Sequence, residues 1–258
     1  MTATTEELVR SREDAVLVVR LNRPAARNAL TPGLIANIGA AIIEAETDPE
    51  IRAVVVTGSG DRAFCAGMDL RAFASGEAVG DDEDTAAYYR LLAGEVTVPL
   101  VGAANGTAIG GGLELLLGCD VIVASEQAKF GFPEVKRGLF PAGGGTSLGT
   151  RIPLSVALEM TLTGDLIDAT RAREIGLVNA VTAPEQVLSS ALEFAERIAQ
   201  NAPLGLAAVK ELVRLGVTDS ARAAERGREW QRVVFASEDA REGATAFVEK
   251  RAPRWRGR

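Results

Sequence analysis

The spacing of hydrophobic positions along the chain predicts an alternation of strands and helices. Residues 16–21 show the two-residue alternation of a strand, which ends at Asn22-Arg23-Pro24. Helical spacing over residues 31–46, preceded by Thr31 as cap and Pro32 at the first helical position, predicts an amphipathic helix. The remaining predictions are strands over residues 53–57, 99–104 and 120–125, and helices over residues 85–94, 184–200, 204–215 and 220–235.

Strands and helices alternate up to about residue 150, and helical spacing alone follows. This order predicts an α/β core with a helical extension. The proline-containing stretch at residues 201–203 is the best candidate for a linker, so we expect one unit over residues 1–200 and a second over residues 201–258. Residues 58–84 are rich in glycine and aspartate, and we expect them to be irregular.

Composition narrows the function more than the fold. With 258 residues, 47% hydrophobic and 24% charged, the chain is expected to be globular, with one core and an appendage. The net charge of −7 argues against a nucleic-acid partner, which requires a basic surface. The sequence contains no histidine, which excludes Ser-His-Asp and Cys-His nucleophiles, an imidazole base and a histidine metal ligand.

No segment is typical of a targeting signal or a membrane span. Residues 1–14 are polar and charged, which predicts no signal peptide. The longest apolar stretch, residues 98–118, contains six glycines together with Pro99 and Glu114, so a lipid-exposed helix is not expected there. We expect a cytoplasmic protein with no membrane partner, and the two cysteines are expected to be buried thiols.

Three consecutive glycines, Gly110 to Gly112, precede Leu113-Glu114 and a run of leucines. Glycine lets a backbone approach a ligand closely, and the leucines predict a helix that begins here. The N-terminus of a helix offers unpaired N–H groups and the positive end of the helix dipole, which together stabilise an oxyanion. Glu114 lies in this first turn, where it fits either a catalytic carboxylate or a residue that complements the dipole.

A second carboxylate, Glu134, follows the apolar and aromatic segment Phe130-Gly131-Phe132-Pro133. Burial in such a setting raises the pKa of a carboxyl group, as a general acid at neutral pH requires. Taken alone, Glu134 also fits the start of a capped helix. Because the chain has no histidine, Glu114 and Glu134 beside a glycine-lined backbone are the natural candidates for general acid–base catalysis.

Several motifs resemble the enoyl-CoA hydratase (crotonase) superfamily, in order and over essentially the whole chain. The N-terminal half contributes Leu21–Pro24, Arg27–Leu30, Phe64-Cys65-Ala66-Gly67-Met68-Asp69-Leu70, Asn105-Gly106 leading into Gly110–Glu114, and Phe130–Glu134. The C-terminal half contributes Leu162-Thr163-Gly164, Ala172, Gly176-Leu177-Val178 and Ala246–Arg251.

The resemblance implies a crotonase spiral of ββα units over residues 1–200 and a helical region over residues 201–258 used for trimerisation, as a homotrimer or a dimer of trimers. It implies an acyl-CoA thioester substrate, whose carbonyl is held in an oxyanion hole by the backbone N–H groups of Met68 and Gly111. It implies no metal or redox cofactor, since coenzyme A is part of the substrate. Residues implied to line the CoA and thioester channel, or to approach the nucleotide end of CoA, are Arg27, Ala29, Ala66, Asp69, Leu70 and, from a neighbouring subunit, Lys250.

Within that family, the presence of both glutamates favours hydration. Family hydratases carry two, whereas the isomerases usually keep only the second. We expect a lyase that adds water across the double bond of a trans-2-enoyl-CoA to give a 3-hydroxyacyl-CoA, a reaction of fatty-acid β-oxidation. Glu114 is then the base towards water and Glu134 the acid towards the α-carbon. The alternatives are a Δ3,Δ2-enoyl-CoA isomerase that uses mainly Glu134, and a non-catalytic acyl-CoA-binding or RNA-binding paralogue.

The sequence departs from the family pattern at two places. After Pro141–Thr146 the family often has a polar and then a basic residue, whereas this chain has Ser147-Leu148-Gly149. Met68 stands where a smaller residue is usual, and its side chain is expected to narrow the acyl pocket. Together with residues 71–96, these departures leave the acyl group open among short fatty, branched, aromatic and steroid-derived chains.

Overall fold

Strands from distant parts of the sequence form two sheets. The computed structural model describes residues 6–258, which contain the strands β1 (Leu8–Glu13), β2 (Val16–Leu21), β3 (Ala53–Gly58), β4 (Ala63–Cys65), β5 (Leu100–Ala104), β6 (Thr107–Ile109), β7 (Val121–Ser125), β8 (Lys129–Gly131), β9 (Ile167–Asp168) and β10 (Ala180–Thr182). The larger sheet has the order β1-β2-β3-β5-β7-β10 and is parallel except for the β1–β2 pair. The smaller sheet has the order β4-β6-β8-β9 and is parallel except for β8–β9.

The order of the strands describes a spiral. The chain gives one strand to the larger sheet and the next to the smaller sheet, in the pairs β3 and β4, β5 and β6, and β7 and β8. Helices follow the first two of these pairs and connect them to the next turn. This repeat confirms the spiral of ββα units that the sequence resemblance implied.

Helices enclose the two sheets and then extend beyond them. They are α1 (Pro32–Thr47), α2 (Leu70–Ala74), α3 (Glu83–Ala93), α4 (Gly111–Gly118), α5 (Leu154–Thr163), α6 (Ala169–Glu174), α7 (Val187–Ala199), α8 (Pro203–Thr218), α9 (Ser220–Ala236) and α10 (Glu238–Glu249), with the 3-10 turns η1 (Pro24–Ala26), η2 (Pro133–Arg137), η3 (Gly145–Thr150) and η4 (Pro184–Gln186). Among residues 6–258, none of these helices combines the length and apolar character needed to cross a membrane.

Alternation along the buried strands divides the core into two layers. On β3, Val54 and Val56 pack against the layer that includes α1, α3 and α4, whereas Ala53 and Val55 face α7. This two-residue period is what a strand covered on both faces requires. Helix α1 begins as expected, since the Thr31 hydroxyl accepts a hydrogen bond from the Leu34 N–H at 3.0 Å.

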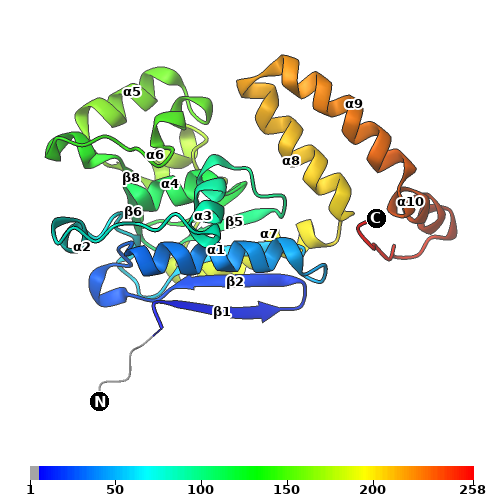
Figure 1. Ribbon diagram of the computed structural model, residues 1–258, viewed down its shortest axis with the longest axis horizontal. Coiled ribbons are helices and arrows are strands. Elements are labelled where there is room, and N and C mark those ends of the chain that lie inside the picture. Colours follow the sequence, from blue (N-terminus) through cyan, green and yellow to red (C-terminus); the bar gives the residue numbers. More distant parts are fainter. Residues whose placement is uncertain (1–5) are drawn as a thin grey trace.

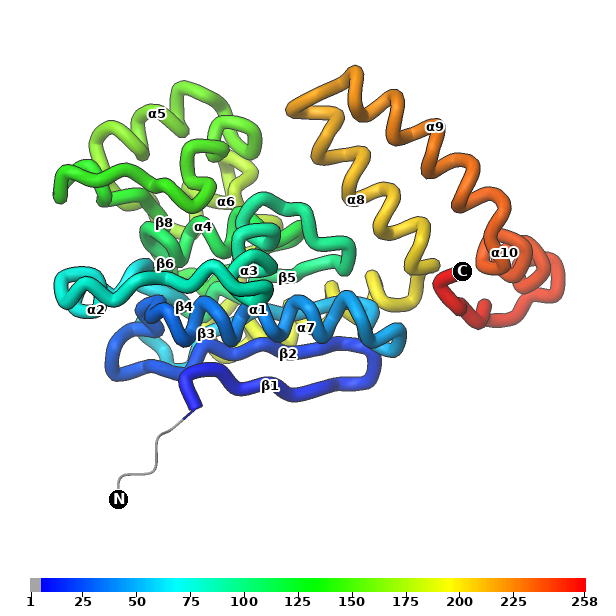
Figure 2. The backbone as a smooth tube through the Cα atoms, viewed as in Figure 1, coloured from blue at the N-terminus to red at the C-terminus, as the bar shows by residue number. Residues whose placement is uncertain are grey.

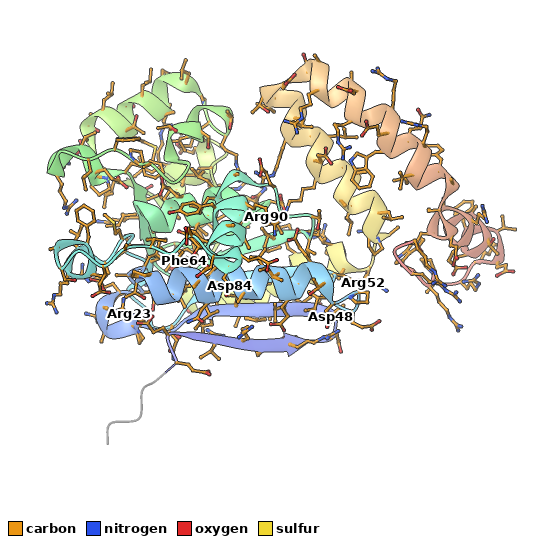
Figure 3. All side chains as sticks on the ribbon, viewed as in Figure 1. Arg23, Asp48, Arg52, Phe64, Asp84 and Arg90 are labelled. Carbon is orange, nitrogen blue, oxygen red and sulfur yellow. The ribbon has the colours of Figure 1, made fainter. Side chains whose placement is uncertain are left out.

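Helices α1 and α3 cross closely above the larger sheet. A Cβ placed on Gly39 of α1 would lie 1.7 Å from the backbone oxygen of Asp84 in α3, so only glycine permits this crossing. Farther along, Arg90 of α3 pairs with Glu46 of α1 at 2.6 Å. Figure 3 marks Asp84 over α1 and Arg90 above this helix. The crossing fixes α3 beside α4, the helix that begins at the glycine triplet.

The C-terminal helices stand to one side of the two-sheet core. Figures 1 and 2 show α8 and α9 running side by side away from the sheets, with α10 at the far end. The terminal segment then returns, because the Trp255 indole N–H donates to Gln200 O at 2.7 Å and Arg52 donates to Trp255 O at 3.1 Å. The gap between α7 and α8, at residues 200–202, overlaps the predicted linker at residues 201–203, whose Pro203 is the first residue of α8.

Most strong periodic segments were predicted correctly. The strands at 16–21, 53–57, 99–104 and 120–125 and the long helices are confirmed within a few residues. The prediction that only helices follow residue 150 is wrong, because β9 and β10 lie beyond it and complete the two sheets. Residues 58–84 are also not wholly irregular, since they contain β4 and α2. These elements have two to five residues, too few for a periodic pattern to identify.

Candidate active site

Two backbone segments meet at the predicted oxyanion hole. One follows β4 and contains Gly67 and Met68, and the other is the first turn of α4, which begins at Gly111. Gly67 has a φ of 81°, and a Cβ placed on it would lie 3.1 Å from the Gly111 nitrogen. A Cβ placed on Gly111 would in turn lie 3.7 Å from the Met68 nitrogen. The fold therefore brings both proposed N–H donors together, and glycine is what permits the approach.

Hydrogen bonds hold the Met68 segment in this position. The Ala66 N–H donates to Arg27 O at 3.0 Å, and the Leu30 N–H donates to Gly67 O at 2.8 Å. At the opposite segment, Gly111 is the first residue of α4, where a backbone N–H has no partner within the helix. The donor of α4 therefore points out of the helix end and is available to a ligand.

Glu114 lies one turn along α4 and is clamped by a distant loop. Its side chain is buried, and its Oε1 accepts hydrogen bonds from the N–H groups of Gly143 at 2.8 Å and Gly145 at 2.9 Å. Burial raises the pKa of Glu114 above its ordinary value, while the two N–H groups oppose this rise by stabilising the ionised form. The clamp also fixes which oxygen of the carboxylate is free to act.

Glu134 lies in the first turn of η2, which follows strand β8 of the smaller sheet. A Cβ placed on Gly110 would lie 2.8 Å from Glu134 Oε1, so this carboxylate sits against the glycine triplet. Burial raises the pKa of Glu134, and the negative charge of Glu114 raises it further. Within residues 6–258, its Oε2 is buried and has no hydrogen-bond partner. A buried, unpaired carboxylate oxygen is costly for the fold, and a substrate-facing role explains it.

The remaining predicted residues divide between the site and its support. Ala66 is half-buried beside the oxyanion segment, and Leu70 is 47% exposed at the start of α2. Arg27 is exposed and Ala29 half-buried in the turn that holds Ala66. The Ala66 N–H bond to Arg27 O joins this turn to the oxyanion segment, and the role of these four residues in binding coenzyme A stays a prediction.

Within one chain, neither Asp69 nor Lys250 is a free side chain at the predicted CoA site. The Asp69 carboxylate accepts from the first N–H groups of α2 and pairs with Arg23 at 3.0 Å, which lowers the pKa of Asp69. It is thus already engaged inside the chain, as a cap and an ion-pair partner. Lys250 ends α10, which Figure 1 places at the opposite end of the molecule from α2, so one chain does not bring Lys250 to this site.

Sequence reasoning missed the residues that support the oxyanion segment. Asn28 is fully buried, and its amide nitrogen donates to Ser59 O, Ala63 O and Phe64 O, each at 3.0 Å. Its position between Arg27 and Ala29 was visible in the motif, but only the fold shows that it pins β4. The glycine clamp on Glu114 was also missed, because it joins positions 29 and 31 residues apart.

Within residues 6–258, no group of three or more histidine, cysteine, aspartate or glutamate side chains is arranged to hold a metal ion. The residues gathered here are instead two carboxylates with raised pKa values and two backbone donors. Such a set can polarise a carbonyl and move protons beside it.

Comparison with known proteins identifies relatives of this arrangement. The family model described as "Enoyl-CoA hydratase/isomerase" matches residues 11–258. A carnitinyl-CoA dehydratase from Proteus mirabilis is 38% identical, with 95% of this chain and 96% of the relative covered. A 2,3-dehydroadipyl-CoA hydratase from Escherichia coli is 39% identical, with 98% and 99% covered. The crystal structure of an enoyl-CoA hydratase from Mycobacterium tuberculosis matches with a TM-score of 0.91 at 39% identity, with 98% of this chain and 100% of that chain covered.

Proposed function

The chain belongs to the enoyl-CoA hydratase/isomerase family, and from this premise we propose that it is an enoyl-CoA hydratase. The reaction adds water across the double bond of a trans-2-enoyl-CoA and gives a 3-hydroxyacyl-CoA. The observation that carries this proposal is a pair of carboxylates with raised pKa values at the glycine triplet: Glu114 in the first turn of α4, and Glu134 against Gly110.

In the proposed mechanism the backbone supplies the electrostatic part. The N–H groups of Met68 and Gly111 donate to the thioester oxygen and stabilise the negative charge that develops on it as the enolate forms. Removal of one donor of this kind typically costs about 2.7–4 kcal/mol of transition-state stabilisation. Because the donors belong to the backbone, the methionine side chain at position 68 is compatible with this role.

The carboxylates supply the proton transfers. Glu114 accepts a proton from water as the oxygen bonds to C3, and Glu134 delivers a proton to C2 of the enolate. The pair thus begins with Glu134 protonated and Glu114 ionised and ends with these states exchanged. Their mutual repulsion favours one shared proton at the start of the cycle, since the charge of Glu114 raises the pKa of Glu134. Exchange with solvent restores the starting state.

Hydration of crotonyl-CoA tests the proposal directly. Loss of the absorbance of the conjugated thioester, with formation of 3-hydroxybutyryl-CoA, is the expected result. Turnover of a 3-enoyl-CoA without hydration of the 2-enoyl-CoA would instead identify an isomerase that works through Glu134. Tight binding of either thioester without turnover would identify the non-catalytic acyl-CoA-binding paralogue.

The same hydration assay can also identify the acyl chain that the enzyme prefers. The relatives compared above are named for carnitinyl-CoA and 2,3-dehydroadipyl-CoA, and both names describe polar acyl chains. A series of crotonyl-CoA, longer unbranched enoyl-CoA and 2,3-dehydroadipyl-CoA would rank the pocket by kcat/KM. Met68 and Leu70, 43% and 47% exposed at the entrance, provide apolar surface for an acyl chain. Because this surface is apolar, we expect unbranched apolar acyl chains to give the highest kcat/KM, ahead of the polar chains named for the relatives.

We also propose a homotrimer or a dimer of trimers built through α8–α10. One stripe on α8 is buried or half-buried within the chain and consists of Leu204, Ala207, Ala208, Leu212 and Leu215. A second stripe on α8, at Val209, Val213 and Val217, is 61–64% exposed, and Phe235, Phe247 and Val248 are 77–86% exposed. Apolar surface of this extent supports burial against neighbouring subunits. Assembly would also place Lys250 near a neighbour's CoA.

Light scattering of the active protein tests the assembly. A mass three or six times that of one chain is expected at micromolar concentration, and deletion of residues 204–258 is expected to give an unstable and inactive chain. A monomer mass for an active enzyme would contradict the proposed assembly. The roles of Glu114 and Glu134 would survive that result, because both residues and both N–H donors lie in one chain.

A further inference from the structure

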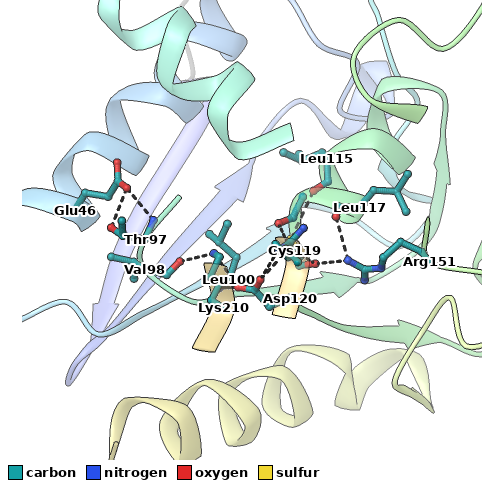
Figure 4. Close-up of polar contacts among 12 residues, drawn as sticks. Glu46, Thr97, Val98, Leu100, Leu115, Leu117, Cys119, Asp120, Arg151 and Lys210 are labelled. Atoms are coloured by element: carbon teal, nitrogen blue, oxygen red, sulfur yellow. Dashed lines mark hydrogen bonds and ion pairs between the residues drawn. The ribbon is translucent and has the colours of Figure 1, made fainter. Parts of the chain in front are cut away.

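The C-terminal end of α4 is fastened by two arginine side chains. The last four carbonyls of a helix have no partner within it, and here all four accept hydrogen bonds. Cys119 serves the first two through its thiol at 3.5 Å and its N–H at 3.0 Å. The other two, on Leu117 and Gly118, accept from Arg151 at 3.1 Å and from Arg214 at 2.9 Å. Figure 4 shows the contacts of Arg151 and Cys119.

Arg214 comes from α8, which begins after the spiral has ended. Its guanidinium donates to Asp120 Oδ1 at 2.8 and 3.3 Å, and Lys210, one turn earlier on the same helix, pairs with Asp120 Oδ2 at 2.9 Å. Lys210 also donates to Val98 O at 2.8 Å, and Asp120 Oδ2 accepts from the Leu100 N–H at 2.8 Å. Figure 4 shows Asp120 between Lys210 and the end of α4. One carboxylate thus joins α8 to the starts of β5 and β7.

The guanidinium of Arg214 occupies space that the backbone leaves for it. Gly94, which ends α3 with a φ of 72°, would place a Cβ 2.2 Å from Arg214 Nη1. Helix α8 otherwise packs mainly against α9, which stands away from the sheets (Figure 1). The ends of α3 and α4 therefore meet α8 through this arginine and its neighbour Lys210.

We propose that Arg214, anchored by Asp120, is a positioning residue that fixes the placement of α4 and thereby the Gly111 N–H donor and the Glu114 carboxylate. This inference rests on the hydratase function proposed above. Helix α4 has eight residues and is about 12 Å long, so it behaves as a short rod whose two ends move together. Freeing one end displaces the other, and a misplacement of about 1 Å at a reacting centre costs about 100-fold in rate.

The same loop that holds α4 at its far end also holds Glu114. Arg151 closes the segment whose N–H groups, at Gly143 and Gly145, donate to Glu114 Oε1. With Arg151 alone, α4 would be fixed only by elements of the spiral. Arg214 adds a second fastening from the C-terminal region, because it donates to Gly118 O and also to Cys119 O, the one acceptor that it shares with Arg151. Arg214 therefore supports the reaction through α4 without contacting the substrate.

The test compares Arg214→Met with Arg214→Lys in the full-length chain. We expect Arg214→Met to fold and to bind crotonyl-CoA with a KM near that of the unmodified protein, while kcat falls by about tenfold or more. Arg214→Lys keeps a charge for Asp120 but loses the planar fork, so its kcat should lie between the two. Arg12→Met is the matched control, because it removes another arginine–aspartate pair, Arg12–Asp48 at 2.9 Å, on the exposed surface of β1 and α1.

A spectroscopic readout separates this inference from the proposed function. The absorbance of a conjugated cinnamoyl-CoA thioester moves to longer wavelength when its carbonyl oxygen accepts hydrogen bonds from an oxyanion hole. We expect a smaller shift in Arg214→Met than in the unmodified protein, at saturating ligand and in the absence of any turnover. If the unmodified protein shifts the ligand but hydrates nothing, the hydratase proposal fails, while the comparison of shifts still tests the role of Arg214.

A purely structural role is distinguished by stability and by a variant outside α8. Asp120→Asn removes the negative charge that anchors Arg214 and Lys210 without altering α8, and it should reproduce the loss of kcat and the smaller spectral shift. The inference is overturned if folded Arg214→Met and Asp120→Asn both keep the unmodified kcat and shift. It is also overturned if kcat falls only in proportion to the fraction of unfolded protein, as measured by circular dichroism.

Discussion

Replacement of Glu114 by glutamine removes a proton acceptor while leaving its surroundings almost unchanged. Glutamine has the same shape as glutamate, and its amide oxygen can accept the hydrogen bonds that Gly143 and Gly145 now donate to Oε1. The loop should therefore remain closed over α4. What is lost is the ability to take a proton from water, so the change isolates the chemical role of this side chain.

The expected loss of activity follows from that role. A positioned acid–base group contributes about 10²–10⁴-fold to a rate. This range corresponds to about 2.7–5.4 kcal/mol of transition-state stabilisation. Hydration of crotonyl-CoA by Glu114→Gln should fall by that factor, while the affinity for the thioester stays close to that of the unmodified protein. If the variant retained more than about a tenth of the normal turnover, Glu114 would not be the base.

The Glu114→Gln change lowers activity, but it should raise the stability of the folded protein towards neutral pH. Burial raises the pKa of Glu114 above the 4.5 of the unfolded chain, so the folded state holds this proton more tightly. The associated stabilisation is fully present below pH 4.5 and is lost as pH rises through the folded pKa. Glutamine does not ionise, so the Glu114→Gln protein loses no stability of this kind as the pH rises.

Thermal unfolding measures this effect. The Tm of Glu114→Gln minus that of the unmodified protein should be smallest near pH 4.5 and should increase towards neutral pH. A difference that is constant or that decreases over this range would refute the reasoning about burial, even if the loss of activity were as expected. The two measurements thus test the environment and the chemistry of Glu114 separately.

Three further predictions concern the same site. Glu134→Gln should also lower hydration by about 10²–10⁴-fold, and normal turnover would remove Glu134 from the mechanism. Gly111→Pro should abolish turnover by deleting a donor, whereas Met68→Ala should keep most of it; a folded but strongly impaired Met68→Ala enzyme would show that the side chain does more than shape the pocket. Gly112→Ala would place a Cβ 2.2 Å from Cys65 O, so urea unfolding should show a loss of about 3 kcal/mol, and unchanged stability would contradict this packing.

Periodicity in the sequence predicted the longer elements because each one buries a regular set of positions. Val54 and Val56 on one face and Val55 on the other mark β3 as a strand covered on both sides. The smaller sheet was not predicted, because β4, β6 and β8 have three residues each and β9 has two. The spiral arrangement came from the resemblance of motifs, since strand pairing across long separations leaves no local signal.

The two glutamates were recognisable in the sequence because each stands among apolar residues, where a carboxylate is unusual. The contacts that tune and position them were not. Gly143 and Gly145 act through backbone N–H groups, which every residue type except proline possesses. Arg214 is one of many arginines on a helix surface, and its partner Asp120 is 94 positions earlier in the chain. Only the fold distinguishes it from a solvent-exposed charge.

The long sequence separation between α8 and the end of α4 also sets the order in which the protein becomes complete during synthesis. Val98 and Asp120 are made 112 and 94 residues before their partners Lys210 and Arg214. At about 5–20 residues per second, the ribosome needs roughly 5–20 s to span that interval. A nascent chain of 200 residues therefore already contains both glutamates, both backbone donors and Arg151, but it lacks the second fastening of α4, which Arg214 supplies. We expect such a chain to remain catalytically silent until translation of α8 is finished.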